Sequence, residues 1–295
     1  MSDARELLGV RLSSPDKVLW EEQGVTKSEL ADYYLAVAER ILPHIARRPV
    51  TLVRCPTGAE KKCFYQRHPA SGVLPQLKEV AVPGFDEPYL YIDDEAGLVA
   101  AVQMGTLELH PWGVTVERPD RPDRIIFDLD PAEGLGFDSV VAAALDVRDR
   151  LEALGLRSFA KTTGGKGLHV VVPILPDVEW REAKAFAKGL AELMSEERPD
   201  LYLARISKAE REGRIFIDYL RNDPTSTAVG PYSTRSRPGA PVSLPIEWEE
   251  VTPGLDPKAF NLRTVPSLIL DRPDPWAEIF DVRQSLGEAA ARLGG

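Results

Sequence analysis

Two acidic side chains stand at the end of a predicted apolar strand. Asp128 and Asp130 occupy alternate positions in the segment 125–130, so both should project from one face of a sheet while Phe127 and Leu129 project from the other. Two carboxylates this close together on an apolar strand repel each other unless a cation neutralises them. Magnesium and manganese both accept oxygen ligands. The pair therefore predicts a divalent metal site.

A third acid, Asp218, lies in a second apolar segment, 215–220. Three carboxylates on neighbouring strands could hold two divalent ions about 4 Å apart, one activating an attacking hydroxyl and the other bridging a triphosphate. That arrangement favours nucleotidyl transfer. Spacing alone leaves an alternative open, in which Asp128 and Asp130 form a solvated strand end before the turn at Pro131, and the same alternative applies to Asp218.

A glycine-rich loop follows within the segment 161–173. Its three glycines allow a phosphate to approach the backbone closely, and Thr163 and Lys166 could donate to it. The loop lacks the spacer and the ending of a P-loop, and a plain hairpin explains the glycines equally well. His169 opens the next strand and could donate to a phosphate, although a lone histidine at such a position is more often structural. The same two interpretations apply to His110.

The charge balance limits how this chain could bind nucleic acid. It has 36 Lys and Arg against 46 Asp and Glu, a formal net charge of −10, so bulk electrostatics would repel a polyanion. Basic residues nevertheless gather in 47–67, in 205–221 and at Arg235 and Arg237. A solvated surface is the ordinary interpretation of one such run. Three runs that flank the motifs above favour local contacts to nucleotide or nucleic acid.

Alternating strands and helices should position these residues. Thr26 and Glu29 form a capping-box pattern, which predicts a helix whose apolar stripe ends at Pro43. The later pattern predicts an open sheet with helices packed on it. We expect strands at 50–54, 64–65, 107–110, 125–130, 158–162, 168–174 and 215–220, a hairpin or projecting loop at 80–93, and helices at 98–104, 138–154 with Asp138 as N-cap, 179–196 and 276–293.

The general composition is that of a globular enzyme. Hydrophobic residues make up 43% and charged residues 28% of the 295 residues, with no apolar run of membrane-spanning length and no signal-peptide pattern, so we expect a cytoplasmic protein. Cys55 and Cys63 are too few for a disulfide framework or a zinc site, and we expect both to be reduced and structural.

Taken in order, these motifs resemble the primase-type polymerase domain of bacterial DNA ligase D, a branch of the archaeo-eukaryotic primase superfamily. The resemblance spans nearly the whole chain and rests on segments 16–20, 26–27, 33–34, 48–56, 64–68, 109–112, 127–131, 164–169, 218–222 and 231–235. It implies an α/β (α+β) fold in which an RRM-like antiparallel or mixed sheet carries the metal site beside a helical and β N-terminal lobe. It also implies one polymerase domain over 1–295, with approximate lobes 1–120 and 121–240 and a C-terminal extension 241–295.

The resemblance also assigns roles to individual residues. It implies that Asp128, Asp130 and Asp218 bind two manganese or magnesium ions. The residues it places around the nucleoside triphosphate are Thr163, Lys166, His169, Arg211, Arg235, Arg54 and Arg221, with His110 near the ribose. Those it places on DNA are Lys17 and Lys27 at a 5′-phosphate, Phe64, Tyr65 and Arg67 along the template, and Asp86 in a loop that brings DNA ends together.

Some features depart from the family pattern. Thr163 stands where serine is common, and Arg67 stands where lysine is frequent, which keeps the charge but changes its geometry. No Lys-x-Asp-Gly ligase motif is present and we see no room for a ligase domain, so we expect a stand-alone polymerase that works with a separate ATP-dependent DNA ligase. The family further implies the end-binding protein Ku as a partner, a preference for ribonucleotides, extension at gaps or double-strand breaks, and association with the nucleoid.

Two other functions use some of the same features. Haloacid-dehalogenase phosphatases also place Asp-x-Asp at a strand end, but they need a later Ser/Thr, a Lys and a further acidic pair that this sequence does not present convincingly. A non-catalytic module could bind DNA ends with the same fold. The presence of all three aspartates argues against the loss of catalysis.

Overall fold

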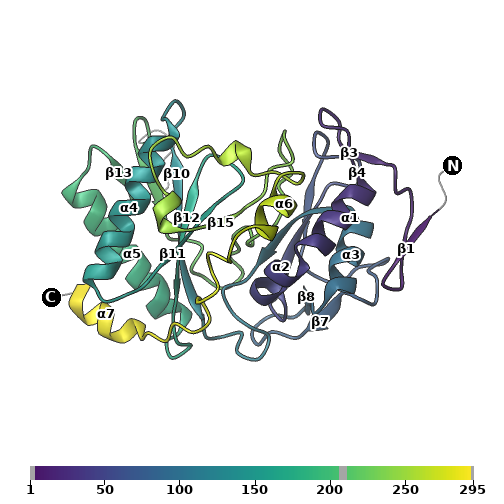
Figure 1. Cartoon of the computed structure of the whole chain (residues 1–295). Helices are drawn as coiled ribbons and strands as arrows, with labels where there is room; N and C mark the ends of the chain where they lie inside the picture. The colour runs from purple at the N-terminus through teal and green to yellow at the C-terminus, as the bar shows by residue number, and fades with distance from the viewer. Residues whose placement is uncertain (1–3, 206–210, 294–295) are drawn as a thin grey trace. The chain divides into compact units, whose positions relative to one another are not determined.

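The computed structural model describes residues 4–205 and 211–293 (Figure 1). The chain forms two compact units, each built from several stretches of sequence. Unit 1 comprises Met1–Glu117, Thr227–Leu244 and Lys258–Pro273, and unit 2 comprises Arg118–Ser226, Pro245–Pro257 and Asp274–Gly295. None of the helices in these described stretches is both long and apolar enough to cross a membrane.

Unit 2 is organised around a six-stranded sheet. Its four inner strands are β10 (Arg124–Pro131), β11 (Phe159–Thr162), β12 (Leu168–Pro173) and β14 (Ile215–Asp218), in the spatial order β14-β10-β12-β11 with every neighbouring pair antiparallel. A helix connects β10 to β11 and another connects β12 to β14, which is the split β-α-β arrangement of RRM-like sheets. The short strand β13 (Tyr202–Leu203) adds a parallel edge and β15 (Pro245–Ile246) an antiparallel one. The expected α/β fold with a mixed sheet is confirmed.

Two long helices, α4 (Phe137–Ala153) and α5 (Trp180–Glu197), contact β10 (Figure 1). Helix α5 begins with a capping box between Glu179 and Glu182 and buries an apolar stripe that includes Phe186 and Leu190. The expectation that Asp138 caps α4 was wrong. Gly136 is the N-cap, and the Asp138 carboxylate accepts a hydrogen bond from the backbone N–H of Gly254 at 2.9 Å.

The C-terminal helix is shorter than expected. Only α7 (Leu286–Leu293) is helical, so the predicted helix over 276–293 was wrong at its start. Trp276 packs instead against Phe159 and Val171 of the sheet, and its indole Nε1 donates to the carbonyl of Ala160 at 2.9 Å. Burial of this large ring on the sheet outweighs the helical preference of the surrounding residues.

Unit 1 contains a three-stranded antiparallel sheet in which β5 (Val50–Arg54) lies between β6 (Phe64–Gln66) and β9 (Thr106–Pro111). Its larger helices are α1 (Lys27–Ala36), α2 (Ala38–Ile45) and α3 (Glu95–Gln103). The remaining elements are the strand pairs β1–β2 (Arg5–Leu7, Val10–Leu12), β3–β4 (Val18–Trp20, Val25–Thr26) and β7–β8 (Lys78–Val80, Tyr89–Tyr91) and helix α6 (Val265–Leu270).

The start of α1 was predicted correctly, but its end was not. The Thr26 hydroxyl accepts from the N–H of Glu29 and the Glu29 carboxylate accepts from the N–H of Thr26, which confirms the capping box. The single helix expected to end at Pro43 is two helices, because Val37 leaves helical geometry and Pro43 lies inside α2. The apolar stripe therefore continues over a break in the backbone.

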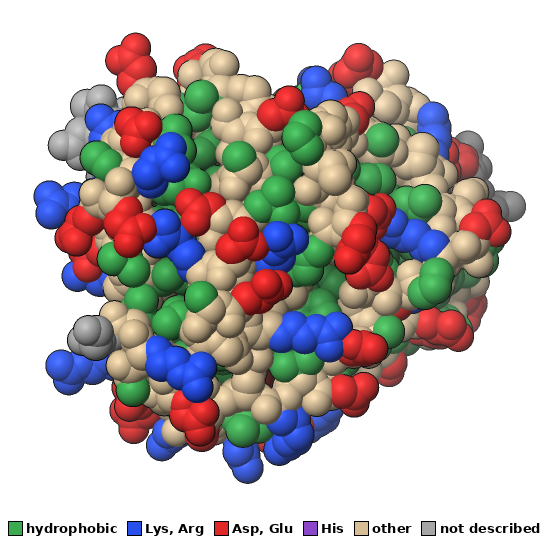
Figure 2. Space-filling model, turned by 60° about the vertical axis from the view of Figure 1, so that its left-hand side comes forward, with side chains coloured by type: hydrophobic (Ala, Val, Ile, Leu, Met, Phe, Trp, Pro, Cys, Tyr) green, Lys and Arg blue, Asp and Glu red, His purple; other side chains and the backbone are tan. Residues whose placement is uncertain are grey.

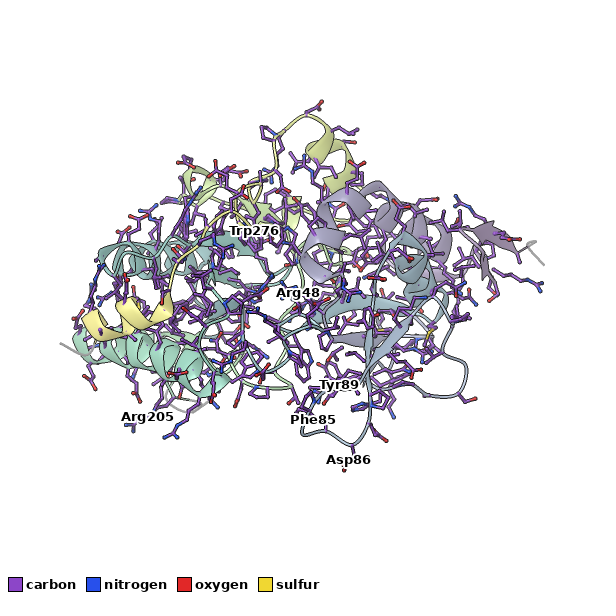
Figure 3. The ribbon with its side chains drawn as sticks, turned by 90° about the horizontal axis from the view of Figure 1, so that it is seen from below. Arg48, Phe85, Asp86, Tyr89, Arg205 and Trp276 are labelled. Carbon is purple, nitrogen blue, oxygen red and sulfur yellow. A yellow bond between two sulfur atoms is a disulfide. The ribbon has the colours of Figure 1, made fainter. Side chains whose placement is uncertain are left out.

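The projecting loop at 80–93 is the hairpin of β7 and β8. Figure 3 shows Asp86 at the outer end of this loop, with Phe85 and Tyr89 behind it. The Phe85 ring packs edge-on against the rings of Tyr89 and Trp112, with centroids 5.6 and 6.0 Å away. The loop is thus held by an aromatic cluster of unit 1 while Asp86 points outward.

Cys55 and Cys63 are joined by a disulfide, so the expectation of reduced cysteines was wrong. The reason lies in the strand register. Arg54 pairs with Phe64 across β5 and β6, which sets the next two residues opposite each other with their Cα atoms 4.3 Å apart. This pairing was not visible in the sequence, where eight positions separate the cysteines.

Candidate active site

A row of polar side chains crosses the inner strands of the unit 2 sheet. Asp128 pairs directly with Asp218 on one side and with His169 on the other, and His169 pairs with Lys161. Residues that are directly opposite in neighbouring strands share a face of the sheet. Asp130 lies two positions along β10 and projects to the same face. These five residues are called the cross-strand row.

The acids of this face lie close to basic side chains. Asp128 is 3.3 Å from His169 Nε2 and 3.3 Å from an Nη atom of Arg221, whose Nε is 3.3 Å from Asp218. Burial opposes ionisation of Asp128, but the contact with His169 and the charges of Arg221 and Lys161 outweigh it and hold the pKa of that carboxyl well below its usual range. Asp128 is therefore ionised at neutral pH.

The pKa values of Asp130 and Asp218 shift in the opposite direction. Burial together with the charges of Asp128 and Asp218 raises the pKa of Asp130 to about 6. Burial is also the main cause that raises the pKa of Asp218, although Arg221 opposes it. The protein thus leaves part of the negative charge on this face without compensation.

His169 is uncharged at neutral pH. Burial and the neighbouring ammonium of Lys161 lower its pKa to about 4, although Asp128 acts in the other direction. The imidazole therefore serves Asp128 as a hydrogen-bonding group, while Lys161 and Arg221 supply the positive charge. Within the described residues, the buried Nδ1 of His169 has no hydrogen-bond partner; because Nε2 carries the proton that faces Asp128, Nδ1 can only accept a hydrogen bond.

The donor set suits a hard divalent cation. Three carboxylates from two adjacent strands supply oxygen ligands of the kind that magnesium and manganese prefer, and the raised pKa of Asp130 shows that a cation is electrostatically favoured there. In the described parts of the chain, no group of three or more acidic, His or Cys side chains has converged into a metal-binding arrangement. Instead, the Arg221 guanidinium lies between Asp128 and Asp218. The residues fit such an ion by chemistry, and Arg221 provides part of the positive charge.

The glycine-rich loop joins β11 to β12 beside this row. Gly164 adopts φ +64°, and a Cβ on Gly167 would lie 2.6 Å from the Leu129 carbonyl, so both positions require glycine. The Thr163 hydroxyl is buried and donates to the carbonyl of Gly167 at 3.1 Å, which closes the loop. Lys166 is exposed at its tip. Of the two predicted phosphate donors, only Lys166 faces solvent.

Arg211 also lies near these acids. Its guanidinium stacks 4.3 Å from the ring centroid of Phe216, which pairs with Asp130 across β10 and β14. Its positive charge opposes the rise in the pKa of Asp130 and of Asp218. Lys161 was not expected among the site residues. The sequence did contain one indication, since Lys161 stands two positions before Thr163. The strand register then sets it directly opposite His169.

Unit 1 holds a second polar cluster, which joins two of the predicted residues. A Glu108 carboxylate oxygen lies 2.7 Å from His110 Nε2 and 2.9 Å from Arg235 Nε. Its other oxygen accepts from the backbone N–H of Ser236 at 2.8 Å and from the Ser236 hydroxyl at 2.6 Å. Burial opposes ionisation, but these partners hold the pKa of Glu108 well below its usual range. The set of Glu108, His110, Arg235 and Ser236 is called the Glu108 cluster.

Sequence reasoning missed Glu108. It is a single acid inside an apolar strand, the same pattern that drew attention to Asp218, and strand alternation places it on the face of His110. Its contacts leave its carboxylate fully compensated. Glu108 is therefore a positioning residue that fixes His110 and Arg235.

A pocket of about 360 Å³ in unit 1 collects three of the predicted cations, Lys17, Lys27 and Arg54. The Lys27 ammonium is buried and donates to the Ser13 carbonyl at 3.0 Å and to the Gln103 side-chain oxygen at 2.7 Å. Burial, with a smaller contribution from Lys17, lowers the pKa of Lys27 to about 8. Lys17 donates to the carbonyl of Pro56. The pocket thus presents cations that are held mainly by neutral oxygens.

The predicted aromatic pair lies on the surface of unit 1. Phe64 is 42% and Tyr65 is 71% exposed, which is unusual for large rings and leaves both available for stacking. The Arg54 guanidinium lies 5.2 Å from the centroid of the Phe64 ring and also donates to Gln66 at 2.6 Å. Arg67 is exposed beside them.

A split β-α-β sheet that presents three carboxylates from two central strands on one face is the architecture of the primase-like polymerases. The family model LigD, primase-polymerase domain matches residues 26–276 of the chain. The chain belongs to this family.

Its relatives are longer proteins. The chain is 37% identical over 292 residues to the multifunctional non-homologous end joining protein LigD of Pseudomonas aeruginosa, covering 97% of the chain and 35% of that protein. It is 35% identical to LigD of Mycolicibacterium smegmatis, covering 92% of the chain and again 35% of that protein. The chain thus spans about a third of the length of these relatives.

A solved structure shows the same fold. The polymerase domain of Mycobacterium tuberculosis ligase D in complex with DNA superposes with a TM-score of 0.83 at 32% identity, and the match covers 92% of this chain and 97% of that one. The primase-like fold expected from the sequence is therefore confirmed.

Proposed function

We propose that this chain is a metal-dependent nucleotidyltransferase that extends the 3′-hydroxyl of a DNA strand with nucleoside triphosphates. One observation carries the proposal: three carboxylates project from adjacent strands to one face, and burial together with the charges of Asp128 and Asp218 raises the pKa of Asp130 to about 6. Membership of the LigD primase-polymerase family and the likeness to a DNA-bound polymerase domain support it.

Asp128, Asp130 and Asp218 would hold two manganese or magnesium ions. When bound, such ions activate the attacking hydroxyl and neutralise the triphosphate. Around them, Lys166 and Arg211 provide positive charge for the triphosphate. Neutral His169 donates its Nε2–H to Asp128 and so holds this metal ligand in place. Arg221 balances Asp128 and Asp218. We propose that Thr163 mainly keeps the glycine loop closed, since its hydroxyl already bonds to Gly167.

The predicted unit 1 residues would bind the remaining parts of the substrates. His110 and Arg235, both held by Glu108, are assigned to the ribose and the triphosphate. Lys17 and Lys27 line a pocket whose charge suits a 5′-phosphate, and Arg54, which also lines it, is assigned to the triphosphate. Phe64, Tyr65 and Arg67 are assigned to template bases and backbone, and the hairpin with Asp86 to the bringing together of DNA ends. We propose that both units serve one polymerase domain.

We place this activity in non-homologous end joining or gap repair, with DNA gaps or broken ends as substrates. The names of the LigD relatives support this setting. From the family resemblance we also propose that the chain prefers ribonucleotides and cooperates with the end-binding protein Ku. A separate ATP-dependent DNA ligase would then seal the strand, and the chain would act in the cytoplasm, in association with the nucleoid.

The test is strand extension on a gapped, 5′-phosphorylated duplex, with ribo- or deoxynucleotides and with manganese or magnesium. The wild-type chain should extend the strand, and Asp128→Ala/Asp130→Ala should abolish extension while sparing duplex binding. The matched control is Asp149→Ala/Asp200→Ala, which removes two exposed acids of unit 2 with side chains 62% and 69% accessible. Unchanged extension in the Asp128/Asp130 variant would contradict the metal assignment.

The same assay separates the alternatives. Release of inorganic phosphate from the triphosphate without strand growth would favour the phosphatase. Duplex binding without extension under any of the metal and nucleotide conditions would favour a non-catalytic end-binding module.

A further inference from the structure

A groove of about 660 Å³ in unit 2 is not used by the function proposed above. It lies between the first half of α5 and the loop that follows β14, and its walls include Trp180, Arg181, Lys184, Lys188, Tyr219 and Pro224. This groove is called the α5 groove. Figure 2, which turns the side bearing α4 and α7 forward, shows Lys and Arg side chains interspersed with acidic and hydrophobic ones. Any anion specificity on this side must therefore be local.

The basic side chains of the groove come from one face of α5. Arg181, Lys184 and Lys188 follow each other at intervals of three and four residues, which stacks them along the helix. Within the described residues, Arg181 has no ion-pair partner, and Lys188 has only an exposed pair with Glu192 at 3.5 Å, a type of contact that is worth little. Both cations can therefore turn to a bound anion.

Lys184 has a different role, because it pairs with Asp223 across the groove. This contact ties the helical wall to the loop wall. The apolar part of the lining includes the half-exposed Tyr219 and the ring of Trp180, whose Nε1 donates to the carbonyl of Pro119 at 3.2 Å. Cations that track a backbone, combined with a ring on which a base can stack, characterise sites for single-stranded nucleic acid.

The groove is fixed relative to the cross-strand row. Tyr219 directly follows Asp218, and the N–H of Leu220 donates to the Asp218 carboxylate at 2.8 Å. Asn222 then binds the loop to β10 by donating to the carbonyl of Ile126 and accepting from its N–H, both at 2.8 Å. The loop wall of the groove is therefore anchored to the same two strands that carry the three acids.

We propose that the α5 groove binds single-stranded DNA, with Arg181 and Lys188 on backbone phosphates and Tyr219 stacked on an unpaired base. This inference rests on the proposed function, because the loop wall of the groove continues the strand that carries Asp218. A polyanionic peptide would satisfy the two cations but would leave the Tyr219 ring without a stacking partner. Single-stranded DNA uses both features of the groove.

The experiment measures binding of the full chain to fluorescein-labelled oligo(dT), by anisotropy, with a chelator present and no nucleotide. Arg181→Glu/Lys188→Glu should weaken binding about tenfold and reduce the slope of log affinity against log salt by about 1.4, the loss expected for two phosphate contacts on a single strand. Arg198→Glu/Arg283→Glu makes the same change in net charge at exposed positions of unit 2 outside the groove and should bind like wild type.

Variants of Tyr219 test the stacking contact. Tyr219→Leu should weaken oligo(dT) binding on the order of tenfold with an unchanged salt slope, whereas Tyr219→Phe should retain binding, because only the ring is needed. Circular dichroism on each variant confirms that the fold is kept. Competition by polyglutamate that matches oligo(dT) charge for charge would overturn the assignment to nucleic acid.

Strand extension, measured in parallel, separates this inference from the proposed function. Wild-type oligo(dT) affinity in the Arg181/Lys188 variant, or a matching loss in the control variant, overturns the groove assignment and leaves the extension activity untouched. Groove-dependent binding in a chain that never extends a strand supports the groove and contradicts the polymerase.

Discussion

The cross-strand row of unit 2 and the Glu108 cluster of unit 1 both bury carboxylates, but the pKa values of Asp130 in the row and of Glu108 in the cluster shift in opposite directions. Glu108 is surrounded by His110, Arg235 and Ser236, and its pKa is held low. Asp130 is buried beside Asp128 and Asp218, and burial together with their charges raises its pKa to about 6. A carboxylate whose charge the protein fully compensates stabilises the local structure. One that is left uncompensated requires a cation from outside.

The largest expected effect is a loss of strand extension, and it tests the uncompensated acid of the cross-strand row. Asp130→Asn should reduce strand extension about a thousandfold, because it removes a metal ligand that supports transition-state charge. Thermal unfolding of the variant should match wild type, since the pKa of Asp130 is raised by burial and by its acidic neighbours and the change removes a repelling charge. A variant that extends normally, or that unfolds much earlier, would show that Asp130 is structural.

The corresponding change from acid to amide in the Glu108 cluster should make the protein less stable. Glu108→Gln should lower the free energy of unfolding by about 3 kcal/mol, because the Arg235 guanidinium and its neighbours lose a buried anionic partner. Denaturant unfolding measures the loss. The control is Glu117→Gln, which breaks an exposed pair with Arg47 and should leave the free energy of unfolding nearly unchanged. Equal losses in the two variants would contradict the structural role of Glu108.

Added metal should distinguish the two clusters directly. At a concentration one hundred times its dissociation constant, manganese should stabilise the wild-type chain by about 2.7 kcal/mol, because it binds only the folded acids. Asp128→Asn/Asp130→Asn should lose this gain, whereas Glu108→Gln should keep it. Thermal shift with and without a chelator measures both. A gain that survives in the double aspartate variant would place the metal elsewhere.

The smallest expected effect concerns the buried ammonium of Lys27 and the affinity for a 5′-phosphorylated DNA end. The pKa of Lys27 is lowered to about 8, mainly by burial, so the ammonium is charged below that pH and loses its proton as pH rises through it. Affinity for a 5′-phosphorylated end, relative to a 5′-hydroxyl end, should fall about tenfold as pH rises past this value, since a charge-assisted hydrogen bond is lost. Lys27→Arg should remove the pH dependence. A flat profile in the wild type would contradict the role of Lys27.

Local patterns in the sequence identified much of the site. Period-two spacing placed Asp128 and Asp130 on one face, and the glycine-rich motif predicted a tight loop, in which Gly164 has a positive φ. The capping box at Thr26 also formed as expected. Each of these features depends on neighbours within a few residues, and short-range sterics and hydrogen bonding are encoded locally.

Other features depended on residues far apart in the chain. Strand register pairs Asp128 with Asp218. Folding also brings Glu108 to Arg235, which follows it in the chain by 127 positions, and core packing places Trp276 on the sheet. The sequence by itself determined which charged residues were candidates for a site and on which strands, helices and loops they would lie. Only the tertiary structure decided which charges met a partner and which stayed uncompensated, because pKa values depend on burial and on neighbours brought together by folding.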